Sequence, residues 1–158
     1  MADLQETPAR MVEDGEVVAF GLFKEEFREV NIDRAQIYAP LPLPAPLLRL
    51  RLKEWQHFAV ISDEFFMGFV VNDNHYVGMS FCYVFDRHDT QFTEHHRQSA
   101  VGAAHVAREL WRDACSFVVK GYSIGVENLL EENRHRIHID IRPDGARPTI
   151  RAELELRE

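Results

Sequence analysis

The chain has 158 residues, enough for one domain with a substantial hydrophobic core, and its composition is ordinary for a globular protein. Its formal net charge of −8 argues against nucleic acid or an anionic membrane surface as the main partner. No apolar run approaches the roughly 20 residues that span a bilayer, so we expect no membrane span.

The N-terminal residues and the two cysteines indicate where the protein works. Met1 to Arg10 are polar and lack the hydrophobic stretch of a secretion signal, so we expect a cytoplasmic protein. Cys82 and Cys115 lack metal-site spacing, which predicts two free, buried thiols. We expect residues 1–15 to form a flexible N-terminus and residues 16–158 a single β-rich domain.

The first predicted elements flank a run of prolines. Residues 17–23 form a short apolar run, and residues 24–36 are charged and mixed. Alternate prolines from Pro40 to Pro46 favour an extended polyproline II segment, which we interpret as the entry to a strand rather than a ligand for a proline-binding module. Residues 48–54 alternate leucine with basic residues, which predicts a strand with a solvated outer face.

Three more strands are predicted at residues 57–62, 65–71 and 76–86. The polar turns between them, at residues 63–64 and 72–74, are short enough to join only neighbouring antiparallel strands. Residues 48–86 are therefore expected to form an antiparallel meander.

The strand at 76–86 has two unlike faces. One face carries bulky side chains, and the other carries Gly78, Ser80 and Cys82 in succession. This pattern is typical of a sheet that is covered on both sides or curled round a space. If the sheet encloses a cavity, we expect it to open on the small-residue face, with Asp86 at one end.

The second half of the chain is also predicted to be rich in strands. Residues 92–97 resemble a short strand, and the apolar spacing in residues 100–111 predicts a short helix, although residues 89–113 are the hardest to interpret. Further strands are predicted at 115–120 and 122–128, and a final hairpin joins 137–141 to 150–156. About nine strands and at most two short helices predict a mainly β fold, an antiparallel up-and-down barrel or sandwich.

Four segments resemble a known family. They are Leu52–Phe58, Tyr76–Gly78, Tyr83–Asp86 and His135–Ile141, and together they resemble the N-terminal half of the bacterial family called domain of unknown function 2804. The resemblance covers about residues 15–156. It implies a lipocalin-like fold, remotely related to carotenoid hydratases and tocopherol cyclases, in which this chain is the first of two barrels. The family has no established activity.

The favoured functional hypothesis is a module that binds a small hydrophobic or lipid-like molecule. Such pockets are mostly apolar with a few polar groups. The candidate ligand-binding residues are Trp55, His57, Tyr76, Gly78, Ser80 and Tyr83. The alternative for these residues is ordinary core packing, with the polar tips hydrogen-bonded.

Two other hypotheses stay open. An acid-catalysed hydratase or cyclase acting on an isoprenoid needs a neutral carboxylic acid in an apolar pocket, and Asp86 is the candidate catalytic residue. The alternative for Asp86 is a turn residue that binds local backbone. An interaction domain would instead pair the edge strand at 150–156 with a second copy, as a homodimer, or with a second barrel. No metal spacing or cofactor motif is present in the sequence.

Overall fold

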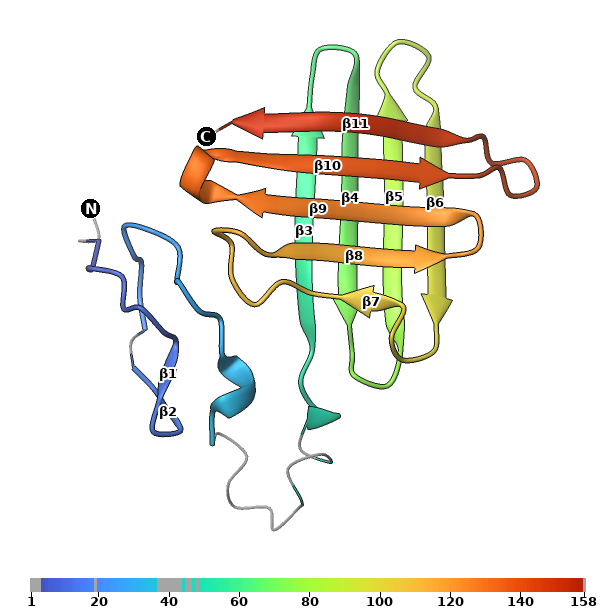
Figure 1. Cartoon of the computed structure of the whole chain (residues 1–158). Helices are drawn as coiled ribbons and strands as arrows, with labels where there is room; N and C mark the ends of the chain where they lie inside the picture. Colours follow the sequence, from blue (N-terminus) through green and yellow to red (C-terminus); the bar gives the residue numbers. More distant parts are fainter. Residues whose placement is uncertain (1–3, 19, 37–43, 45–46, 48, 158) are drawn as a thin grey trace.

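The computed structural model describes residues 4–18, 20–36, 44, 47 and 49–157, and Figure 1 shows their arrangement. Most of the prolines between Pro40 and Pro46, and with them the predicted polyproline segment, lie outside the described residues. Among the described residues, no helix is long and apolar enough to cross a membrane.

Two antiparallel sheets make up the body of the structure. The first contains β3 (Glu54–Ile61), β4 (Phe65–Asp73), β5 (Gly78–Asp86) and β6 (Phe92–Ser99) in chain order. The second has the order β11-β10-β9-β8-β7, formed by β7 (Ala104–His105), β8 (Ala114–Val119), β9 (Tyr122–Leu129), β10 (Arg134–Ile141) and β11 (Ile150–Arg157).

The two sheets pack face to face with their strands crossing steeply, as Figure 1 shows. Both sheets keep open edges, so the mainly β antiparallel fold is confirmed as a sandwich, and the barrel alternative is not the one observed. The meander predicted from the short turns is also confirmed from β3 onward.

The N-terminal part lies beside the sandwich. It contains the two-residue strands β1 (Val12–Glu13) and β2 (Glu16–Val17) and the 3-10 turn η1 (Ile32–Arg34). It contacts the loop before β8, where the guanidinium of Arg28 lies 3.5 Å from the ring centre of Trp111. A second 3-10 turn, η2 (Leu130–Glu132), joins β9 to β10. The mobility of residues 1–15 stays a prediction.

The core lies between the sheets and is built from the inward side chains of alternating strands. Its fully buried members include Phe69, Cys82, Phe117, Tyr122, Ile124, Ile137, Ile139 and Ile141. The small residues of β5 face this core. A Cβ atom added to Gly78 would lie only 3.0 Å from the Ala104 Cβ, and the side chain of Cys82 is completely buried. From Gly78 to Cys82 this face is therefore closed by the second sheet, so the small residues are explained by close packing of the two sheets.

Two predicted elements are wrong. The strand predicted at residues 48–54 is not formed in its described part: Leu50 and Arg51 lie in a turn, and β3 begins at Glu54. The helix predicted at 100–111 is replaced by turns and β7. Gly102 adopts a φ of 95°, which no helix tolerates, and Ala103, Ala104 and Ala107 instead pack against the core from an irregular segment.

The approach of the two sheets at Gly78 gives a first prediction. Gly78→Ala should lower the free energy of unfolding by about 1–3 kcal/mol, because the new methyl group comes too close to Ala104. The matched control is Gly125→Ala in β9, where an added Cβ meets nothing within 4 Å, so stability should be unchanged or slightly raised. Urea unfolding of the three proteins measures both effects, and equal stability of the two variants would contradict the packing described.

The two thiols give a second prediction. Both cysteines are free and buried, as predicted, and burial raises the pKa of Cys82 to about 12 and that of Cys115 to about 11. Unfolded thiols ionise near pH 9.0 while the folded ones stay protonated. The stabilisation is complete below this pH, and above it the free energy of unfolding should fall by about 1.4 kcal/mol per pH unit for each thiol, up to its folded pKa.

Urea unfolding between pH 8 and pH 10 measures this slope. The Cys82→Ala/Cys115→Ala variant is the control. It is expected to be less stable at every pH, but its free energy of unfolding should fall less steeply over that interval, because it has no thiols to ionise. The same slope in both proteins would contradict the prediction.

Candidate functional site

The outward side chains of the four-stranded sheet form one continuous apolar layer, here called the aromatic face. Cross-strand pairing places them in rows, such as His57–Val70–Phe81 and Ile61–Phe66–Phe85–Phe92. The aromatic face comprises Trp55, His57, Ile61, Phe66, Val70, Met79, Phe81, Tyr83, Phe85 and Phe92.

Tyr83 lies at the centre of the aromatic face. Its ring centre is 5.7 Å from that of Phe66, 6.1 Å from Phe81 and 5.9 Å from Phe92. The ring lies across Gly68, since a Cβ atom added there would be 2.4 Å from the phenol carbon of Tyr83. Because Gly68 has no side chain, the Tyr83 ring can lie over it and contact the other three rings.

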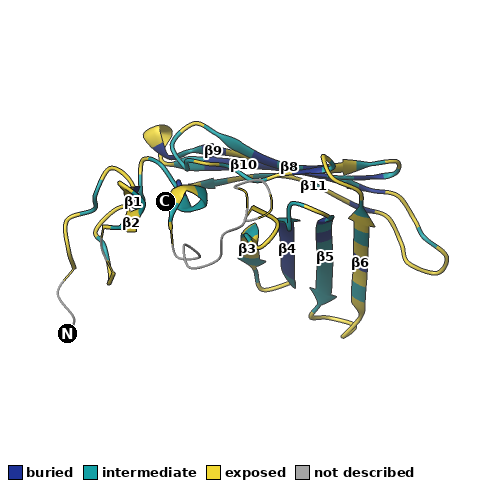
Figure 2. Cartoon of the chain, turned by 90° about the horizontal axis from the view of Figure 1, so that it is seen from below, coloured by how far each residue is buried: buried dark blue, intermediate teal, exposed yellow. Residues whose placement is uncertain are grey.

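The aromatic face is open to solvent. Trp55, Ile61 and Phe92 are 61%, 66% and 59% exposed, respectively. In Figure 2 the second sheet covers one side of the four-stranded sheet, and no described segment covers the other. Exposed polar residues of β6 border the face, namely Glu94, His96 and Gln98. A contiguous apolar surface with a polar border is typical of an interaction site.

The structure brings together three of the six predicted ligand-binding residues. Trp55, His57 and Tyr83 lie on the aromatic face, and the ring centre of His57 is 6.4 Å from that of Phe81. Tyr76 lies in the turn before β5, beneath the ammonium group of Lys53 at 4.0 Å.

Gly78 and Ser80 point to the opposite side of the sheet, into the core. The Ser80 hydroxyl donates to the Val70 carbonyl at 2.7 Å and lies 3.2 Å from the Tyr122 hydroxyl. Whether any of the six residues binds a ligand stays a prediction.

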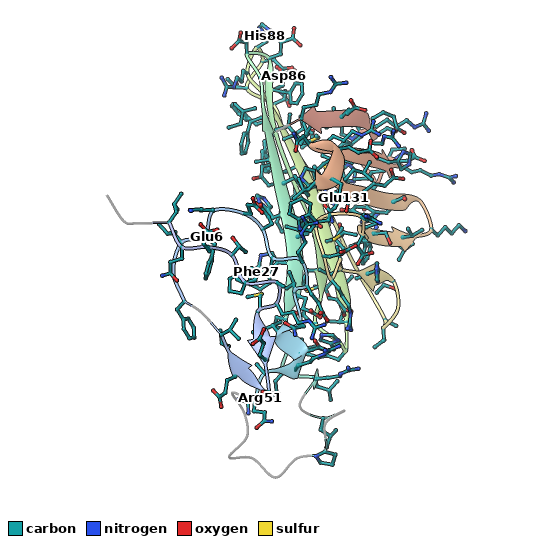
Figure 3. All side chains as sticks on the ribbon, turned by 60° about the vertical axis from the view of Figure 1, so that its left-hand side comes forward. Glu6, Phe27, Arg51, Asp86, His88 and Glu131 are labelled. Carbon is teal, nitrogen blue, oxygen red and sulfur yellow. The ribbon has the colours of Figure 1, made fainter. Side chains whose placement is uncertain are left out.

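Asp86 lies at the tip of the β5–β6 hairpin, next to His88, as Figure 3 shows. Its Oδ1 atom accepts a hydrogen bond from the backbone N–H of His88 at 2.8 Å and a longer one from that of Asp89 at 3.4 Å. This is the local backbone contact expected of a turn residue. The hollow beside Asp86 is open to solvent and lies beyond Cys82, where the inward face of β5 ends next to the start of β11. A catalytic role for Asp86 stays a prediction.

A family model described as Domain of unknown function (DUF2804) matches residues 3–158. The chain belongs to the DUF2804 family. No curated protein and no solved structure matches this DUF2804 chain. The family is thus the one that the sequence resembles, while the lipocalin-like relation stays a prediction.

Sequence patterns do not predict the polar cluster that lies between the two sheets of this DUF2804 chain. The Gln56 Nε2 atom donates to Asn128 Oδ1 at 2.8 Å, and Asn128 Nδ2 donates back to Gln56 Oε1 at 3.2 Å. The His135 ring nitrogen Nδ1 lies 3.1 Å from Asn128 Oδ1, and the Cys115 thiol donates to Gln56 Oε1. These residues come from four strands, so no local pattern links them.

The polar cluster contains no recognisable metal centre. Within the described part of the chain, no group of three or more histidine, cysteine, aspartate or glutamate side chains could hold a metal ion. Asn128 is completely buried and makes hydrogen bonds to two other strands. We interpret the cluster as a hydrogen-bond network that determines the position of β3 relative to β9 and β10.

Removing the central amide tests this interpretation. Asn128→Leu should lower the free energy of unfolding by about 2–4 kcal/mol, because the half-buried Gln56 and the buried His135 each lose a hydrogen-bond partner. The control is Glu127→Leu, an exposed position on the same strand, which should change stability by less than about 0.5 kcal/mol. Thermal unfolding of both variants measures these changes in stability. Equal losses in the two variants would contradict the stabilising role of the cluster.

Proposed function

We propose that this domain binds a small hydrophobic or lipid-like molecule on its aromatic face. The observation that carries the proposal is the position of Trp55, His57 and Tyr83, which share one exposed layer with five phenylalanine and isoleucine side chains. The proposal places the ligand outside the sandwich, because the space between the sheets is filled by the core.

An apolar ligand suits this surface better than a charged one. The residues of the face are uncharged except for the titratable ring of His57, while charge and polarity lie at the β6 border. Burial of apolar surface contributes about 25 cal/mol per Å². A sheet face contacts only one side of a ligand, in contrast to an enclosed pocket, so we expect micromolar rather than nanomolar dissociation constants.

The protein carries its own probe for this binding. Trp55 is exposed on the aromatic face, whereas Trp111, the other tryptophan, stacks with Arg28 beside the sandwich. In a Trp111→Phe background, oleate added below its micelle concentration should shift the emission of Trp55 to shorter wavelength in a saturable way. No shift with oleate, together with no apolar molecule found by native mass spectrometry of the purified protein, would exclude the proposed function.

Two further variants locate the site. Ile61→Ser should weaken oleate binding about tenfold, which corresponds to about 1.4 kcal/mol of lost apolar contact. Gly68→Ala should also weaken it, because the new methyl group displaces the Tyr83 ring from the cluster. The control is Val118→Ser, which is similarly exposed at 59% but lies on the other sheet. Equal loss in all three variants would place the binding elsewhere.

A further inference from the structure

The strand β11 ends the five-stranded sheet with an unpaired edge. Among the described residues, β10 alone pairs with β11. The N–H of Arg142, just past β10, donates to the Gly121 carbonyl at 2.9 Å, which fixes the phase of the hydrogen bonds across the sheet. In β10, the even-numbered residues therefore form backbone hydrogen bonds with β9 and the odd-numbered residues with β11. The register of β10 and β11 then assigns the even-numbered residues of β11 to the hydrogen bonds with β10. The backbone groups that point outward belong to Arg151, Glu153, Glu155 and Arg157.

A groove runs beneath this edge. Figure 1 shows the β3–β4 and β5–β6 hairpins extending past β11, so the inner face of the four-stranded sheet continues beyond the last strand of its partner sheet. A hollow of about 320 Å³ lies there, and it is lined by Val84, Asp86, Gln91, Thr93 and residues 148–151. This volume is about ten times that of a water molecule, which leaves room for several side chains.

The walls of the groove are held in place. The His95 ring donates from Nε2 to the Pro148 carbonyl at 2.7 Å, which ties the start of β11 to β6. Val84 is half-buried at the margin of the core, and Ile150 is buried beside it. A strand added to β11 would therefore find hydrogen-bond donors and acceptors at its side and apolar side chains below it.

We propose that the edge of β11 and the groove beneath it bind an extended segment of another polypeptide, which adds a sixth strand to the sheet. Alternate side chains of the segment would be apolar and cover Val84. Those on the other face would include a basic residue opposite Glu153, whose side chain is 76% exposed, on a chain of net charge −8. β10, with isoleucines inward and His138 against Glu153, has the same pattern.

A second copy of this chain fits the edge less well. Antiparallel self-pairing centred on Leu154 would place Arg151 opposite Arg157 and Glu153 opposite Glu155, and pairing centred on Glu153, which has the same overlap, would place Glu153 opposite itself. The hairpins that extend past β11 would also meet the same hairpins of the second copy in one layer. A single strand avoids both conflicts.

The test uses a fluorescent eight-residue peptide in which isoleucine alternates with polar residues, with fluorescence anisotropy as the readout. The polar residues are lysine where they would lie opposite Glu153 and Glu155 and glutamate where they would lie opposite Arg151 and Arg157. We expect micromolar binding, because one added strand forms an interface at the small end of the known range. A peptide with N-methyl groups on the residues that would bond β11 should bind at least tenfold more weakly. No binding of the first peptide, or equal binding of both, would overturn the proposal.

Variants of Glu153 place the peptide on the protein. Glu153→Pro removes one outward N–H and should weaken binding at least tenfold, while β10 keeps its bonds to Ala152 and Leu154. Glu153→Ala keeps the N–H and should weaken binding less than threefold. In the unchanged protein, the peptide should slow hydrogen exchange of the Glu153 and Glu155 amides. Unaltered exchange in the presence of saturating peptide would overturn the proposal even if Glu153→Pro failed to fold.

Discussion

The distance between the two sheets at Gly78 is the constraint on which the rest of the structure depends. Ala104 approaches β5 so closely at Gly78 that this inward position must be small. Since side chains alternate along a strand, the bulky residues of β5 must then point outward. The aromatic face is thus a consequence of the close packing on the opposite side of β5. The same strand contributes small residues to the core and bulky residues to the aromatic face.

The polar cluster adds specificity to this apolar packing. Isoleucine and phenylalanine side chains fill the core at many relative positions of two sheets, and they do little to select one. The paired amides of Gln56 and Asn128 form both hydrogen bonds in one arrangement only, and Asn128 must be satisfied because it is completely buried. The cluster lies where β3 crosses β9 and β10, and therefore selects one crossing of the two sheets.

Strands and turns could be predicted from the sequence because they depend on local alternation. Residues 57–86 and the closing hairpin were predicted within a few positions, and the two faces of β5 were identified. The side on which each face lies could not be predicted, because it depends on which sheet packs against β5. For the same reason Trp55 and Tyr83 were expected to share a pocket with Ser80, which lies on the opposite side of the sheet. Residues 100–111 were mistaken for a helix because Ala103, Ala104 and Ala107 pack against the core between the sheets from turns and a short strand.

The open aromatic face also bears on how the molecules behave toward one another in concentrated solution. Exposed apolar surfaces attract each other at short range, and only the repulsion between like-charged molecules keeps them apart. The net charge of −8 provides this repulsion near neutral pH, and it vanishes at the isoelectric point near pH 5.5. Mild acidity therefore removes the electrostatic barrier while leaving Trp55, Ile61 and Phe92 exposed, so colloidal stability rests on the carboxylates scattered over the remaining surface.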